Sequence, residues 1–183
     1  MSTEDIHGLV CRLVRDEDPR VLEVLFDAFA APLTAFLAAR LEDRAEAEDV
    51  VQQMFLDLAR RPRQLLAVRR LEPWLFVKAR HLAVDRIRAR ARAARRAADA
   101  PSWLEPVAPP GAPERADEAR LAAAVARLPP EQREVIVLKV LQNRTFAETA
   151  EILGVPANTA ASRYRYALEK LREWMEEGGG HES

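Results

Sequence analysis

Apolar residues recur every three or four positions along most of the chain, which is the spacing of one face of an α-helix. The first such series follows Asp18-Pro19, where Asp is the expected N-cap and Pro the first helical residue. Pro32 lies inside the series and is expected to kink or divide the helix. The apolar positions are Val21, Leu22, Leu25, Phe26, Phe29, Leu33, Phe36, Leu37 and Leu41.

Two further helices are expected before the composition changes near residue 97. One spans about Ala45 to Ala59 and ends at Arg61-Pro62. The other opens at Pro73-Trp74, after a basic loop over 64–70, and becomes almost pure Ala and Arg towards Arg96. Together with the first series they predict a helical bundle of three or four helices over residues 1–96.

Residues 97–116 are rich in proline and are expected to form a flexible linker between two domains. Proline lacks a backbone N–H and disfavours helix, so this stretch is typical of an extended connection. The residues that carry this expectation are Pro101, Pro106, Pro109, Pro110, Gly111 and Pro113.

A second helical domain is expected over residues 117–177, with a disordered tail over 178–183. Its four short helices begin with one near Ala116 to Arg127 and a second opened by Pro129-Pro130. Thr145 and Glu148 have the spacing of a capping box at the start of the third helix. The last helix is expected from about Asn158, its N-cap, to Met175.

The last two helices have the pattern of a helix-turn-helix. Ala150 is small enough for a close helix crossing, and Gly154, four residues later, tolerates the positive φ of a tight turn. Recognition helices meet base edges and phosphates with their N-terminal half. The candidate DNA-binding residues there are Thr159, Ser162, Arg163, Tyr164, Arg165 and Tyr166. An ordinary helical hairpin with a solvated basic face remains the alternative for this feature alone.

The formal net charge of −1 conceals a strong asymmetry along the chain. Residues 42–57 hold six acids and one base, whereas residues 60–96 hold thirteen bases and two acids. An acidic segment directly before a basic one predicts two partners, one of them a polyanion. The three histidines are scattered and no nucleophile–base pair or phosphate-binding Gly loop occurs, so neither an enzyme nor a cofactor or metal site is expected.

The remaining composition predicts an all-α, soluble protein of the cytoplasm. The single cysteine, Cys11, excludes an internal disulfide and is expected to be a buried apolar residue rather than a redox switch. The first residues lack the pattern of a signal peptide. No apolar run was expected to approach the roughly 18 residues that span a bilayer, so membrane insertion is not predicted.

Two sequence blocks in this order resemble the sigma-70 family of RNA polymerase sigma factors, in its extracytoplasmic-function group. The segments 47–56 (AEDVVQQMFL) and 74–81 (WLFVKARH) resemble region two of that family. The segments 128–138 (LPPEQREVIVL) and 146–154 (FAETAEILG) resemble region four. The resemblance covers roughly residues 10–96 and 117–176. It implies a transcription initiation factor that binds core RNA polymerase and promoter DNA, with an anti-sigma factor as a further candidate partner.

The resemblance also implies a role for each region. Region two would dock on a coiled coil of the largest polymerase subunit and would recognise and melt the minus-ten element. Region four would read the minus-thirty-five element and meet the polymerase flap. The docking residues would be Glu48, Asp49, Gln52 and Gln53. The minus-ten residues would be Arg69, Arg70, Trp74, Lys78, Arg80, His81, Arg86 and Arg88, with Trp74 more typical of core than of a stacking platform. Further cations for phosphate would be Arg92, Arg95 and Arg96.

Two positions depart from the family pattern. His81 stands where the family commonly has Asn. The last helix begins Asn158-Thr-Ala-Ala-Ser-Arg163 where the family often has Gly-Thr-Val-Lys-Ser-Arg. Ala160 is expected to reduce an apolar contact, and Ala161 to remove a cation that would touch DNA. These departures concern the promoter sequence and leave the expected fold unchanged.

Two other interpretations stay open at this point. A stand-alone helix-turn-helix regulator would explain residues 117–176 and would act as a symmetric dimer on palindromic DNA. It would leave the acidic and basic segments of the first domain unexplained. An interaction protein that binds polymerase without starting transcription is the second alternative, and the altered recognition helix is compatible with it.

Overall fold

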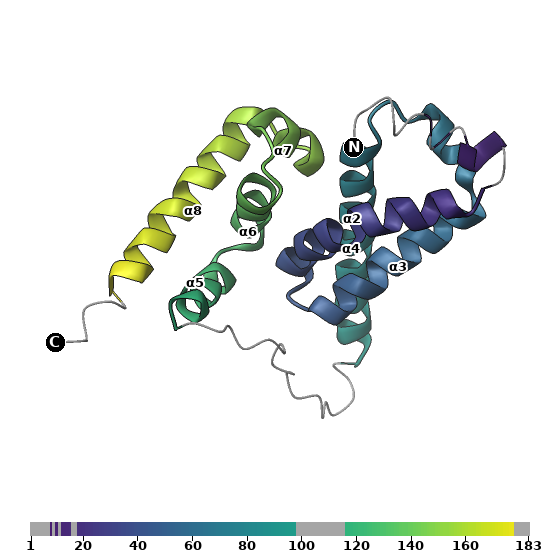
Figure 1. Cartoon of the computed structure of the whole chain (residues 1–183). Helices are drawn as coiled ribbons and strands as arrows, with labels where there is room; N and C mark the ends of the chain where they lie inside the picture. Colours follow the sequence, from purple (N-terminus) through teal and green to yellow (C-terminus); the bar gives the residue numbers. More distant parts are fainter. Residues whose placement is uncertain (1–7, 9, 11, 16–17, 98–115, 178–183) are drawn as a thin grey trace. The chain divides into compact units, whose positions relative to one another are not determined.

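A computed structural model describes residues 8, 10, 12–15, 18–97 and 116–177 (Figure 1). The chain divides into two compact units, Met1–Arg90 and Ala91–Ser183, which we call the N-terminal unit and the C-terminal unit. All regular structure in the described ranges is helical, which confirms the all-α expectation. Cys11 and most of the proline-rich segment, residues 98–115, lie outside the described residues.

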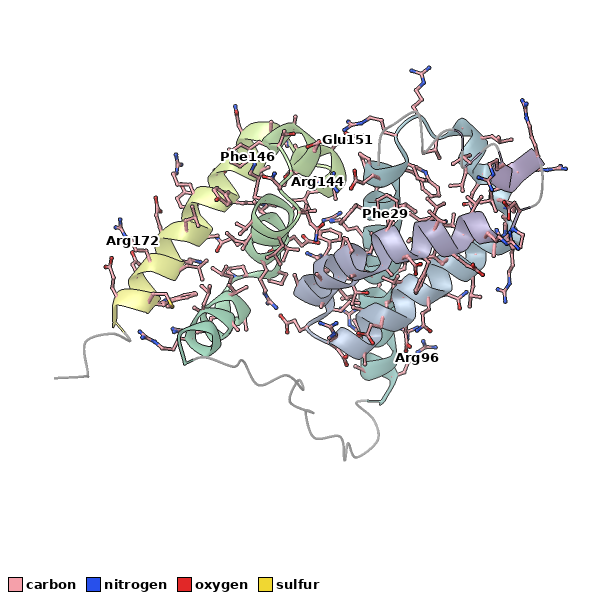
Figure 2. All side chains as sticks on the ribbon, viewed as in Figure 1. Phe29, Arg96, Arg144, Phe146, Glu151 and Arg172 are labelled. Carbon is pink, nitrogen blue, oxygen red and sulfur yellow. The ribbon has the colours of Figure 1, made fainter. Side chains whose placement is uncertain are left out.

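The N-terminal unit is a bundle of three long helices, α2 (Arg20–Leu41), α3 (Arg44–Arg60) and α4 (Leu71–Ala97). Apolar side chains from all three helices fill its interior (Figure 2). Phe36 of α2 and Phe76 of α4 are fully buried and meet edge to face with ring centroids 5.5 Å apart. Met54 of α3 is also fully buried. The predicted apolar stripes therefore converge on one core.

The start of α2 corrects the sequence prediction: the helix begins at Arg20, so Pro19 and not Asp18 is its N-cap. The Asp18 carboxylate accepts the backbone N–H of Arg20 at 3.1 Å and a hydrogen bond from Arg12 at 2.7 Å. The hydrogen bond from Arg12, aided by that from the Arg20 backbone, holds the pKa of Asp18 below its ordinary value. The expectation that Pro32 might divide the segment is wrong, since α2 continues through it.

The α2 helix is long and apolar enough to cross a membrane by length and composition, contrary to the sequence expectation. Its 22 residues have a window of mean hydropathy 1.8. The helix nonetheless packs against α3, and Leu25, Leu33 and Leu37 are completely buried within the N-terminal unit. Its hydropathy therefore reflects its place as a core helix of this bundle.

Two further boundaries in the N-terminal unit differ from prediction. A 3₁₀-helix, Pro62–Ala67, replaces the first part of the expected basic loop, and its Leu65 is buried. The α4 helix starts at Leu71, so that Pro73 falls within its first turn instead of opening it. Proline is tolerated there because the first backbone N–H groups of a helix have no partner within it.

The C-terminal unit contains α5 (Ala116–Arg127), α6 (Pro130–Ile136), a π-helical segment (Val137–Leu141), α7 (Phe146–Leu153) and α8 (Ala157–Glu177). The predicted bounds of α5 are confirmed. Ala97 and Ala116, expected at the ends of the linker, are helical residues of α4 and α5. A buried cluster joins α5, α6 and α8 and consists of Ala124, Leu128, Ile136, Ala167 and Leu171.

Candidate DNA-binding and polymerase-binding surfaces

The turn between α7 and α8 has the geometry of a helix-turn-helix. The capping box is confirmed: Thr145 Oγ1 accepts the N–H of Glu148 at 3.2 Å, and Glu148 Oε2 accepts the N–H of Thr145 at 2.9 Å. Gly154 has φ 64°, in the left-handed region that favours glycine. Ala150 is buried, and its carbonyl accepts the N–H of Val155 at 3.1 Å. The two residues singled out by the sequence therefore build the turn.

The start of α8 corrects one prediction. The helix begins at Ala157, and the Pro156 carbonyl accepts the N–H groups of Thr159 at 2.9 Å and Ala160 at 3.1 Å. Asn158 is therefore the second residue of the helix and not its N-cap. Its side chain is exposed and bonds to no group in the described part of the chain. The amide is consequently available to an external partner.

The inner face of α8 holds the helix in the unit. Ala160 and Ala167 are fully buried, which agrees with the expectation that Ala160 occupies an apolar contact. Tyr164, predicted to bind DNA, is half-buried instead, and its ring meets Phe146 edge to face at 5.6 Å. Tyr164 also packs against the buried cluster. The Tyr164 ring is therefore held by packing within the C-terminal unit.

The outer face of α8 carries polar side chains that the fold leaves accessible. Arg165 and Tyr166 are exposed, with the Arg165 guanidinium 5.3 Å from the centre of the Tyr166 ring. Thr159, Ser162 and Arg163 are half-buried, and the Ser162 hydroxyl donates to the Thr159 carbonyl at 3.0 Å. Five of the six predicted residues thus lie near the accessible first half of the helix.

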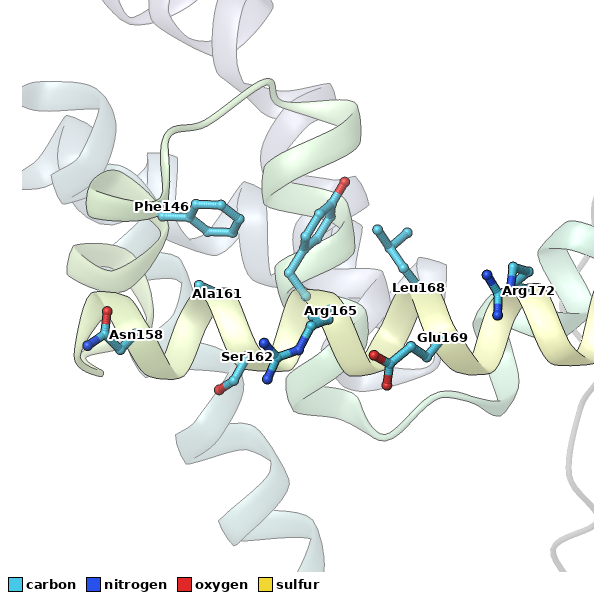
Figure 3. Close-up of a pocket in the computed structure, with 9 residues that line it drawn as sticks. Phe146, Asn158, Ala161, Ser162, Arg165, Leu168, Glu169 and Arg172 are labelled. Atoms are coloured by element: carbon cyan, nitrogen blue, oxygen red, sulfur yellow. The ribbon is translucent and has the colours of Figure 1, made fainter.

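A shallow hollow of about 670 Å³ follows this face of α8 (Figure 3). It adds residues that the sequence prediction omitted, namely Asn158 as a contact residue, Ala161, Leu168, Glu169 and Arg172, together with Phe146 of α7. Figure 3 shows Asn158, Ser162, Arg165 and Glu169 along the same helix. These four residues are three or four positions apart, which places them on one face of the helix, and this spacing is the sequence signal that identifies them.

The exposed face of α3 carries the predicted docking residues Glu48, Asp49, Gln52 and Gln53. Glu48 pairs with Arg44 one turn earlier, with an N–O distance of 3.0 Å. The other three line a groove of about 490 Å³ between α3 and α4. The sequence did not predict the remaining lining, which consists of Val50 and Leu56 of α3 and of Leu82, Asp85, Arg86 and Ala89 of α4.

Cations of α4 fall into two groups, and Arg86, expected among the minus-ten residues, belongs to the group that pairs with α3. The Glu46 carboxylate of α3 accepts from Arg86 Nε and from Arg90 Nη1, each at 3.1 Å. The Glu46 side chain retains 14% of its accessible surface, so this double ion pair is shielded from solvent on one side. Arg86 is therefore held against α3 while about half of its side chain (53%) stays exposed.

The other predicted minus-ten residues differ in exposure. Arg69, Arg70, His81 and Arg88 are exposed, and Arg80 is half-buried. Arg88 approaches Asp85 at 3.8 Å, a weak surface pair. Towards the end of α4 the expected phosphate-binding residues are also exposed; they are Arg92, Arg95 and Arg96 (Figure 2).

Trp74 and Lys78 form a local pair at the start of α4. The Lys78 ammonium lies 5.3 Å from the centre of the Trp74 ring and donates to Gln64 Oε1 at 3.3 Å. Trp74 is half-buried, so it belongs to neither the fully buried core nor a freely exposed stacking surface. Lys78 spans from α4 to the 3₁₀-helix and orders this corner of the unit.

The fold and these surfaces define a class of protein: a helix-turn-helix DNA-binding protein with a second unit that carries a groove beside an acidic helix. Two family models agree with this class in detail. Sigma-70 region 2 matches residues 25–93, and Sigma-70, region 4 matches residues 118–171.

Full-length relatives lead to the same conclusion. The chain is 32% identical to the RNA polymerase sigma factor CarQ of Myxococcus xanthus over 89% of this chain and 94% of CarQ. It is 32% identical to the ECF RNA polymerase sigma factor SigL of Mycobacterium tuberculosis over 87% of this chain and 91% of SigL. The chain therefore belongs to the extracytoplasmic-function group of the sigma-70 family. It is an initiation factor that binds core RNA polymerase and directs it to promoter DNA.

Two solved structures show the same fold. The sigma factor RpoE of Bartonella quintana, in complex with the anti-sigma factor NepR, has a TM-score of 0.70 at 24% identity, over 84% of this chain and 96% of that one. CnrH, in complex with the cytosolic domain of CnrY, has a TM-score of 0.64 at 21% identity, over 93% and 96%. The stand-alone regulator and the interaction protein without initiation activity are therefore not favoured.

Proposed function

We propose that α8 reads the upstream promoter box with the accessible side chains of its first turns. The observation that carries this is the exposed polar face directly after the capped Gly154 turn. Arg163 and Arg165 are suited to guanine or phosphate, because guanidinium groups donate in pairs. Thr159, Ser162 and Tyr166 would add contacts to bases or backbone. Tyr164 would support the helix through Phe146 instead of reading DNA.

We infer that the N-terminal unit opens the downstream box with basic side chains that precede α4 and lie along it. Arg69, Arg70, Arg80, His81 and Arg88 would contact the separated strands, since melting requires cations along the phosphate backbone. Arg92, Arg95 and Arg96 would hold the phosphates of the adjoining duplex. Trp74 and Lys78 would shape the corner next to the opened base, because their mutual contact limits their freedom.

The face of α3 would bind core polymerase. Asp49, Gln52 and Gln53 present a carboxylate and two amides on neighbouring turns. Such a surface suits a helix with basic and amide side chains, as the coiled coil of the largest subunit would offer. Glu48 would contribute less than Asp49, because it is already paired with Arg44.

Three further features complete the proposal. The protein would act in the cytoplasm, where its polymerase is, and would contribute no catalytic activity, because RNA synthesis belongs to the polymerase. In the described residues, no group of three or more His, Cys, Asp or Glu side chains is arranged for a metal ion. The complex of RpoE with NepR supports an anti-sigma factor as a further partner, and the C-terminal unit would also meet the polymerase flap.

Transcription in vitro tests the proposal directly. Core polymerase freed of sigma factors would be mixed with a library of promoter fragments, with and without the protein. Specific start sites that depend on the protein are expected, and alignment of the selected fragments gives both promoter boxes. Binding to core without any start site would leave the proposed DNA contacts of both units without support.

A further inference from the structure

The groove between α3 and α4 contains one cation in a fixed position. Arg86 lines the groove opposite Asp49, Gln52 and Gln53, and the Glu46 carboxylate holds its guanidinium at 3.1 Å. Arg90 binds the same carboxylate at the same distance but does not line the groove. Both arginines bind the Glu46 carboxylate, but only Arg86 also lines the groove.

We propose that Arg86 is a polymerase-docking residue, that the α3–α4 groove as a whole is the docking site, and that Glu46 is the residue that positions Arg86 in it. This inference rests on the proposed docking function of α3 and extends it to α4. It also moves Arg86 from the DNA-contacting set to the polymerase-contacting set.

The chemistry of the groove supports a protein helix as its occupant. Leu56 keeps 52% of its surface exposed, and half-buried Leu82 lines the same groove. Apolar side chains in a polar rim are the arrangement that a partner side chain desolvates on binding. The groove also carries charges of both signs: two carboxylates, Asp49 and Asp85, and one guanidinium, Arg86. A partner helix with both basic and acidic side chains would complement them. The carboxylates of Asp49 and Asp85 would repel the phosphates of DNA, so core polymerase fits this lining better.

The position of Glu46 explains why the arrangement is fixed before docking. Its carboxylate accepts from two guanidinium groups and is largely shielded from water. An arginine that is already ordered loses less side-chain entropy on binding, and a pre-organised contact strengthens association. Glu46 acts through Arg86 and would itself make no contact with the polymerase.

The experiment compares Arg86→Ala with Arg90→Ala in the full chain. Both variants remove one ion pair from Glu46, but only Arg86 lines the groove. Binding to core polymerase would be measured by fluorescence anisotropy, and promoter opening by the fluorescence of 2-aminopurine in the downstream box at saturating core. We expect Arg86→Ala to weaken core binding about tenfold and Arg90→Ala to change it less than about threefold. Thermal unfolding would verify that both variants fold.

Further variants separate the possible failures. Glu46→Gln is expected to weaken core binding by about threefold to fivefold, and Glu46→Asp to restore part of the loss. If Arg86→Ala leaves core affinity unchanged and lowers promoter opening, Arg86 belongs to the DNA surface and the inference is overturned. Equal losses for Arg86→Ala and Arg90→Ala would assign a structural role to the ion pairs. Asp49→Lys tests the underlying function: if it binds core normally, the α3 face itself does not dock.

Discussion

The two units treat their charged side chains in different ways. In the N-terminal unit several charged side chains have partners within the unit: Glu46 pairs with Arg86 and Arg90, Glu48 pairs with Arg44, and Lys78 donates to the Gln64 amide. On the first turns of α8, by contrast, Asn158 and Arg165 are exposed, and the Arg165 guanidinium lies 5.3 Å from the centre of the Tyr166 ring.

This difference suggests two kinds of recognition. The N-terminal unit presents a groove whose lining cation, Arg86, is held by the Glu46 carboxylate, which suits one constant partner such as the polymerase. The accessible side chains of α8 keep their hydrogen-bonding groups for base edges, which differ from promoter to promoter. Charge density alone does not distinguish these cases, because both surfaces contain arginine.

The largest effect is expected from Arg165→Ala, which tests the α8 side of the comparison. Loss of a guanidinium that contacts a base should reduce discrimination of the upstream box by about 10- to 100-fold. Core affinity should stay within about twofold, because Arg165 belongs to the C-terminal unit and the α3 face to the N-terminal unit. Competition between promoter fragments measures the first quantity, and anisotropy the second.

Arg172→Ala is the matched control for this variant. Arg172 lies two turns further along α8 and approaches Glu176 at 3.6 Å. A small change is expected, since recognition helices contact bases with their N-terminal half. Equal loss of core binding and promoter selection in Arg165→Ala would contradict the proposed division between the units.

A somewhat smaller effect is expected from Asn158→Ala. The Asn158 amide is exposed and has no bonded partner among the described residues, so it can pair with adenine in the major groove. Removing it should relax the preference at one base position by about 1–2 kcal/mol and leave the others unchanged. Selection from a randomised upstream box would show which position is affected. A uniform loss at all positions would indicate a phosphate contact instead.

The next prediction concerns the turn that presents α8. Gly154→Ala introduces a Cβ that meets nothing within 4 Å, so steric clash with other groups contributes no cost. The cost is conformational, because φ is 64°, and should be about 1–2 kcal/mol. Gly154→Asn should cost less, since asparagine tolerates the left-handed region better. Hydrogen exchange of peptides from α7 and α8 under native conditions would measure both effects.

If Gly154→Ala left the exchange of these peptides unchanged, the positive φ would not be under strain in that variant. The C-terminal unit would then have adjusted the turn. Comparison with peptides from α2 and α3 provides an internal reference, because those helices belong to the other unit.

Local features of the fold could be predicted from the sequence because their determinants are adjacent in it. The bounds of α5, the Thr145–Glu148 capping box and the Gly154 turn each depend on residues within a few positions. The all-α class followed from apolar spacing in the same way. Pro32 does not divide α2, because the apolar face of that helix is buried both before and after the proline.

The surfaces were predictable only in part, because they depend on how helices pack. Arg86 and Glu46 are forty residues apart, and the spacing within each helix does not reveal that the two faces meet. Tyr164 looks accessible in sequence, yet Phe146 from α7 covers its ring. Asn158 is a residue type that often caps helices, which is why the sequence favours it as the N-cap. In the folded turn the helix begins earlier, because the Pro156 carbonyl accepts its first N–H groups.

The smallest effect is expected from Asp18→Asn, which extends the comparison to another carboxylate bound within the N-terminal unit. The pKa of Asp18 is lowered by the hydrogen bond from Arg12 and by the backbone N–H of Arg20. Because the folded pKa lies below the ordinary value of 3.8, the ionised carboxylate stabilises the fold above that pH, and this contribution is lost as the pH falls through the folded value. The side chain is reached by solvent, so the contribution is small. The unfolding midpoint of Asp18→Asn should therefore lie slightly below that of the unsubstituted chain at neutral pH, and the difference should disappear as the pH falls through the lowered pKa of Asp18. A difference that stays constant over this range would show that Asp18 acts through the shape of the helix start and not through its charge.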